Sequence, residues 1–213
     1  MIFTTNVKIK IHYSLIIFII LSLFLGQLKY VLIFLTIVLL HEGGHIFALL
    51  LFKGELQKIT LTVVGGIIDV NDYKLNNLQN LIVSLSGITI NVLIILIIKN
   101  IYIDSAIKEV ILSYNKLMIA FNLLPIYPLD GFRIIEVFLN MVFDYEYAQD
   151  LSTIVSSFFL ILICMYGMIS KSGAIIIISI FLFLKMLERR KVLKFSRIRH
   201  NAYNIALIRR LNR

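Results

Sequence analysis

The stretch Leu39-Leu40-His41-Glu42-Gly43-Gly44-His45-Ile46-Phe47 decides how this chain is interpreted, because it sets a His-Glu-x-x-His motif inside a long apolar run. On a helix, His41 and His45 lie four residues apart on one face, so both imidazoles can reach one metal ion. Zinc suits such a pair, and a catalytic zinc site keeps one position for water, so a third protein ligand is required elsewhere. Glu42 would be the general base that takes a proton from that water.

A motif with three fixed positions also matches by chance, so its surroundings have to be weighed. Two histidines and a glutamate on an otherwise apolar helix each cost on the order of a few kcal/mol in hydrocarbon unless they are paired. Ionisable clusters in such segments are therefore functional as a rule. We interpret the motif as a metal site.

The composition indicates an integral membrane protein: of 213 residues, 60% are hydrophobic and only 15% are charged. The single cysteine, Cys164, offers no intrachain disulfide and no cysteine metal cluster. We expect an all-α polytopic membrane protein with about six transmembrane helices and a small β-hairpin inserted after the second. Apolar segments at 13–26, 29–52, 78–98, 151–169 and 173–187, with a less regular one that ends before Pro125, supply the six; the first is read as a retained span.

The expected hairpin covers residues 57–70, which are rich in β-branched side chains and interrupted by Gly65 and Gly66. An open sheet edge cannot face lipid, so the hairpin must be buried, line a wet cavity or lie at the interface. Its edge near a catalytic site could pair with an extended substrate, which makes Gly65 and Gly66 candidate substrate-binding residues. A purely structural hairpin is the alternative.

The third ligand is expected where the fourth span ends, in a stretch that holds both prolines of the chain, Pro125 and Pro128. Asp130 follows this break and is the natural third zinc ligand. The alternative role for Asp130 is the N-cap of a helix over residues 132–143. Asn122 precedes the break and could donate a hydrogen bond to the oxyanion that forms when water attacks a peptide carbonyl.

Small and hydroxylated residues mark two further positions. Gly43 and Gly44 permit close approach either of another helix or of a substrate, and both readings stay open. The third span carries Ser84, Ser86, Gly87, Thr89 and Asn91, a density typical of helix packing. Asn91 could bond either a neighbouring helix or the site.

The net charge is confined to the C-terminal end of the chain. From Lys185 onward there are ten Lys or Arg and one acid, Glu188, so this segment carries the whole net charge of +9 and the remainder is neutral. By the positive-inside rule it is cytoplasmic, and an even number of spans then puts the N-terminus on the same side. We expect a transmembrane domain over 1–187, with its core at 29–136, and a basic tail over 188–213 that lies on anionic lipid rather than nucleic acid.

These residues resemble the site-2 protease family of intramembrane zinc metalloproteases. The resemblance covers residues 29–136 and rests on His41-Glu42-Gly43-Gly44-His45, on the glycine pair of the hairpin, and on Asn122-Leu123-Leu124-Pro125 with Pro128-Leu129-Asp130-Gly131. Within the family, the chain is most similar to the stage IV sporulation protein FB subgroup.

The resemblance implies zinc on His41, His45 and Asp130, Glu42 as the base, and cleavage of a protein substrate in or near the bacterial cytoplasmic membrane. The subgroup implies a membrane-associated sigma-factor precursor as substrate and membrane-embedded regulatory proteins as partners. Phe132 departs from the pattern, because relatives commonly have a second glycine there, and it could narrow the approach to the site. A metal-binding membrane carrier and a non-proteolytic scaffold are the alternative functions.

Overall fold

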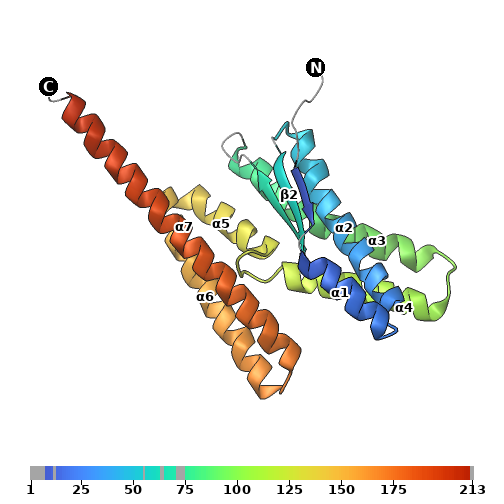
Figure 1. Cartoon of the computed structure of the whole chain (residues 1–213). Helices are drawn as coiled ribbons and strands as arrows, with labels where there is room; N and C mark the ends of the chain where they lie inside the picture. Colours follow the sequence, from blue (N-terminus) through green and yellow to red (C-terminus); the bar gives the residue numbers. More distant parts are fainter. Residues whose placement is uncertain (1–7, 12, 55, 63–64, 71–74, 212–213) are drawn as a thin grey trace.

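The computed structural model describes residues 8–11, 13–54, 56–62, 65–70 and 75–211, and the side chains of 8–11, 14, 55–74 and 196–213 lie outside this description. Seven helices and three strands follow one another in the described residues (Figure 1). They are β1 (Lys8–Ile11), α1 (Tyr13–Phe24), α2 (Leu28–Leu51), β2 (Leu56–Thr62), β3 (Gly65–Val70), α3 (Asn77–Asn100), α4 (Ser105–Asn122), α5 (Asp130–Val142), α6 (Tyr145–Ile169) and α7 (Gly173–Leu211).

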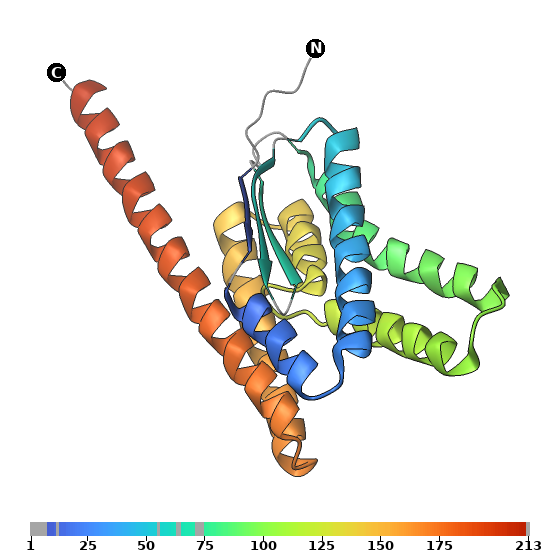
Figure 2. The same ribbon diagram turned by 45° about the vertical axis from the view of Figure 1, so that its right-hand side comes forward.

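The strands form one sheet in the order β1-β2-β3, placed beside α2 (Figures 1 and 2). β1 pairs with β2 in parallel, with Lys8 opposite Lys58, and β2 pairs with β3 antiparallel, with Thr62 opposite Gly65. The register of β2 and β3 shifts between Leu56 and Lys58. The N-terminal strand is thereby tied to the segment that follows α2.

The expected fold class is wrong. The chain is not all-α with an isolated hairpin, because β1 joins the segment after α2 in a three-stranded sheet. A four-residue strand that pairs with residues fifty positions later leaves no local signal in the sequence.

The expected six spans are also not found. Among the described residues, three helices are long and apolar enough to cross a membrane, namely α2, α3 and α6. α1 has 12 residues and α5 has 13, which is short of the roughly 20 that a bilayer requires. α4 carries Lys108, Glu109 and Lys116, and in α7 the apolar residues give way to basic ones within a single helix.

α7 is the longest element and runs antiparallel to α6 (Figures 1 and 2). Its 39 residues extend about 58 Å at roughly 1.5 Å per residue, about twice the hydrocarbon thickness of a bilayer. The expected division between domain and tail after residue 187 falls inside this continuous helix. That division stays a prediction. The expected contact of the tail with lipid also stays a prediction, because most of the tail's side chains lie outside the described part of the structure.

The segment between α4 and α5 is anchored against α6 and α7. Ile126 and Leu129 are buried in one cluster with Leu160, Leu182 and Met186. The backbone N–H of Tyr127 also donates a hydrogen bond to Ser156 Oγ of α6 over 3.0 Å. The proline-containing turn is therefore held from both later helices at the point where α5 begins.

α2 packs most extensively against α3, and the two neighbouring glycines of its motif differ in that packing. A Cβ atom at Gly44 would lie 2.8 Å from the backbone oxygen of Ser86 and 2.7 Å from Cγ1 of Ile90. A Cβ atom at Gly43 would meet nothing within 4 Å. Of the two readings of this pair, helix packing therefore applies to Gly44.

We predict that Gly44→Ala destabilises the protein by about 1–3 kcal/mol, because the added methyl group overpacks the α2–α3 contact. Gly43→Ala is the matched control: it meets open space and gains about 0.5–1 kcal/mol of helix propensity. The measurement is the thermal unfolding midpoint of each metal-free variant in detergent. Equal midpoints for the two variants would contradict this account of the interface.

Candidate metal centre

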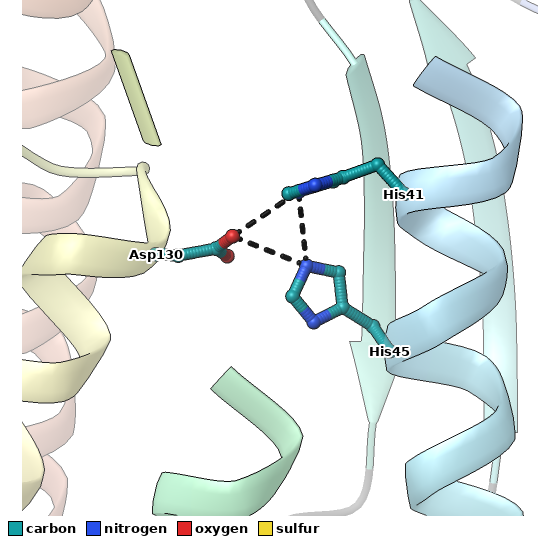
Figure 3. A group of neighbouring side chains, drawn as sticks. All are labelled: His41, His45 and Asp130. Carbon is teal, nitrogen blue, oxygen red and sulfur yellow. Dashed lines mark hydrogen bonds and ion pairs between the residues drawn. The ribbon is translucent and has the colours of Figure 1, made fainter. Parts of the chain in front are cut away.

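His41 and His45 lie one turn apart on α2, and both side chains are buried, with 2% and 5% of their surface exposed. They point away from α2 toward the start of α5 (Figure 3). Their Nε2 atoms are 3.2 Å apart. The helical spacing of the motif thus brings two nitrogen atoms to one point, as predicted from the sequence.

Asp130 completes the group from α5, of which it is the first residue. Its Oδ2 atom lies 3.1 Å from Nε2 of His41 and 3.2 Å from Nε2 of His45 (Figure 3). The N-cap of α5 is Leu129, so the alternative role of Asp130 as an N-cap does not hold. Residues 85 positions apart in the sequence therefore converge on one buried point.

The hydrogen bonds on the far side of each imidazole determine which nitrogen carries the proton. His45 Nδ1 lies 2.7 Å from the backbone oxygen of Val83, which can only accept, so this Nδ1 donates. His41 Nδ1 lies 3.1 Å from Oδ1 of Asn91 and donates to it. In the neutral imidazoles both Nε2 atoms are therefore unprotonated, and their lone pairs face each other and the carboxylate of Asp130.

Three buried lone-pair atoms that face one another repel unless a cation lies between them. Ligand atoms in a tetrahedral zinc site are about 3.3 Å apart when each bond is about 2.05 Å long, and the three separations here are 3.1, 3.2 and 3.2 Å. Two imidazole nitrogens and one carboxylate oxygen also form a donor set typical of catalytic zinc. The three residues therefore fit a divalent metal ion with an open fourth position.

α3 forms the wall behind the two histidines, which the sequence interpretation did not foresee. A Cβ atom at Gly87 would collide with Nε2 of His45 and would lie 2.6 Å from Cε1 of His41. Val83, Gly87 and Asn91 follow one another at spacings of four, so they share one face of α3. This spacing of four was the signal in the sequence that could have indicated their role. Asn91 is 0% exposed and bonds His41 of the site, so it does more than link two helices.

The other predicted site residues lie at different places. Glu42 is buried on α2 beside the histidines and interacts electrostatically with His45. Asn122 is buried at the end of α4, where its amide donates to the backbone oxygen of Met118 over 3.2 Å. Gly65 and Gly66 are the first two residues of β3. The catalytic roles of Glu42 and Asn122, and the substrate-binding role of the two glycines, stay predictions.

The chain is similar in fold and in sequence to known proteins. The structure matches the solved site-2 protease from Methanocaldococcus jannaschii with a TM-score of 0.67 and 18% identity, covering 88% of this chain and 93% of that one. In sequence, the chain is 23% identical over 211 residues to a zinc metalloprotease of the same organism. No family model matches.

The chain therefore has the fold of a site-2 protease, and its resemblance to that family of membrane proteins is confirmed. The more particular resemblance is confirmed as well, since the chain is 28% identical over 161 residues to the Stage IV sporulation protein FB of Bacillus subtilis. These two curated relatives are matched over 92% and 73% of this chain, but it spans only 61% and 56% of their own lengths.

We predict that Asn91→Ala weakens metal binding about 10- to 100-fold, because the His41 ring loses the acceptor that fixes its tautomer and orientation. Asn115→Ala is the matched control, since Asn115 is equally buried but donates within its own helix to the backbone oxygen of Ile111. The measurement is zinc affinity by competition with a chromophoric chelator. If both variants bind zinc like the unmodified protein, Asn91 has no such role.

Proposed function

We propose that this chain is an intramembrane zinc metalloprotease that hydrolyses a peptide bond of a membrane-associated protein. One observation carries the proposal: Nε2 of His41, Nε2 of His45 and Oδ2 of Asp130 meet in a buried triangle with sides of 3.1–3.2 Å. Glu42 adjoins this triangle in the same turn of α2. A site that only bound metal would need the three ligands but not the neighbouring acid.

His41, His45 and Asp130 would hold the zinc ion, which supplies the Lewis acidity that makes a water molecule nucleophilic near neutral pH. Glu42 takes a proton from that water and later delivers it to the leaving amine. Burial of the site excludes bulk water and strengthens these electrostatic interactions. Asn91 and the Val83 carbonyl keep both imidazoles in the tautomer that leaves Nε2 available.

Asn122 is proposed to stabilise the oxyanion of the attacked carbonyl. Its side chain offers two N–H groups, and the hydrogen bond to Met118 uses one of them. Gly65 and Gly66 are proposed to lie along the bound substrate, because β3 is an edge strand in the order β1-β2-β3. An extended peptide can add to such an edge through its main chain.

We propose that the protein lies in the bacterial cytoplasmic membrane with both chain ends in the cytoplasm. The C-terminal ends of α2 and α7 point to the same side of the molecule (Figures 1 and 2). The basic residues that follow residue 185 assign that side to the cytoplasm. β1 pairs with β2, which begins five residues after α2 ends, so the N-terminal strand is held near the same side.

The proposed substrate is a membrane-associated sigma-factor precursor that is processed during sporulation. The similarity to the Stage IV sporulation protein FB supports this substrate class. Membrane-embedded proteins would regulate the reaction, and the lipid bilayer is its medium. Nucleic acid is not a proposed partner.

We predict that Glu42→Gln abolishes cleavage by at least about 100-fold while leaving about one zinc per chain, because the amide keeps the shape of the side chain but cannot accept the proton. The measurement pairs zinc content with cleavage of a co-expressed membrane-tethered sigma-factor precursor from the same organism. Asp130→Asn is the contrasting variant, since it alters a ligand and weakens zinc binding itself.

A Glu42→Gln variant that still cleaves would refute the assigned base. If the unmodified protein binds zinc but cleaves neither this precursor nor an unrelated membrane-tethered peptide, the metal-carrier function takes its place. Zinc uptake into vesicles that contain the protein then tests the carrier directly.

A further inference from the structure

A second polar cluster lies on α5, away from the metal centre. Arg189 of α7 forms an ion pair with Glu136 of α5. The guanidinium carbon of Arg189 also lies 4.3 Å from the centroid of the Phe132 ring and 5.1 Å from that of Tyr127. Only 11% of the Arg189 side chain and 20% of the Glu136 side chain is exposed. We call these four residues the arginine clamp.

The arginine clamp holds the face of α5 that does not carry Asp130. Phe132 and Glu136 are four residues apart and therefore share a face, roughly 200° around the helix from Asp130. Phe132 is 1% exposed, and its ring meets that of Tyr127 edge to face at 5.5 Å. Phe132, the residue that departs from the family pattern, thus packs against the guanidinium group of Arg189.

The arginine clamp includes residues on both sides of Asp130 in the sequence. Tyr127 precedes Asp130 by three residues, and Phe132 follows it by two. Between them, Gly131 packs so closely on the end of α4 that a Cβ atom would collide with the backbone oxygen of Leu123. The carboxylate of Asp130 is therefore placed by contacts from α4 on one side and from α7 on the other.

Arginine suits this position for physical reasons. Its planar guanidinium can stack on two rings while its N–H groups reach the Glu136 carboxylate, and it stays charged at any relevant pH. A lysine ammonium keeps the charge but cannot offer the same planar contact. A buried charge that lost its partner would be unfavourable, so the clamp resists displacement of α5 relative to α7.

We propose that Arg189 is a positioning residue that holds Asp130 in place as the third metal ligand, which rests on the proposed function. A metal site requires its ligands within about 0.5 Å of the productive geometry, so a shift at the start of α5 weakens binding. Arg189 lies just beyond the apolar part of α7. The basic end of α7 therefore carries the residue on which the Asp130 position depends.

The test compares zinc affinity across variants of the full chain in detergent, by chelator competition and by the visible absorption of the cobalt-substituted protein. Arg189→Ala is expected to bind zinc about 10- to 100-fold more weakly and to alter the cobalt spectrum, as loss of an outer-sphere contact does. Arg189→Lys and Phe132→Leu are expected to lose affinity in the same direction but less. Arg190→Ala is the matched control. Arg190 is the next residue and is exposed, and in the described residues its side chain donates a hydrogen bond to Ser157 Oγ instead of joining the clamp.

A merely structural role would lower the thermal midpoint of the metal-free protein and leave zinc affinity and the cobalt spectrum unchanged. That result for Arg189→Ala would overturn the proposal. If Arg189→Ala does not fold, Glu136→Gln replaces it, since it keeps the volume of the side chain and removes only the charge; unchanged affinity there would overturn the proposal equally. An unmodified protein that binds no zinc would instead refute the metal site on which the proposal rests.

Discussion

The structure depends on the convergence of three electron-pair donors at one buried point. Two imidazole nitrogens from α2 and one carboxylate oxygen from α5 face one another at 3.1–3.2 Å. Without a cation this arrangement is repulsive, because the Val83 carbonyl and Asn91 direct the imidazole protons to the opposite side of each ring. The surrounding helices therefore have to hold the three donor atoms together against their mutual repulsion. This requirement accounts for the close contacts around the site.

Those contacts come from elements with distinct tasks. α3 has a glycine at the point of contact, so the imidazoles of α2 can pack against its backbone at Gly87. The turn before α5 is fixed by burial of Ile126 and by the hydrogen bond from Tyr127 to Ser156. α7 holds the opposite face of α5 through Arg189. α3 thus restrains the two imidazoles, whereas the turn before α5 and helix α7 restrain Asp130.

Local patterns in the sequence predicted the parts of the site that lie on single helices. The spacing of His41 and His45 specifies one face, and the position of Asp130 after two prolines specifies a carboxylate at a helix start. Long-range pairing was not predictable in the same way: β1 is four residues long, and its partner strand is fifty residues away. The number of spans was overestimated because α1 has only 12 residues, α4 carries charged residues, and α7 runs without a break from apolar into basic residues. In the sequence, Gly87 and Asn91 could be recognised only as a small and a polar residue of a packed helix, and not as the wall behind the two histidines.

α5 shows how the length of a helix and the chemistry of the site are connected. It has 13 residues, too few to cross a bilayer, and it bears polar contacts on two faces: Asp130 toward α2 and Glu136 toward α7. A helix exposed to lipid could not carry both, since each would be an unpaired charge in hydrocarbon. Packed against α3 and α6 and paired with α7 through Arg189, the same helix can present the buried Asp130 carboxylate while Glu136 is neutralised by Arg189. A helix too short to cross a bilayer thus brings the third ligand to the metal.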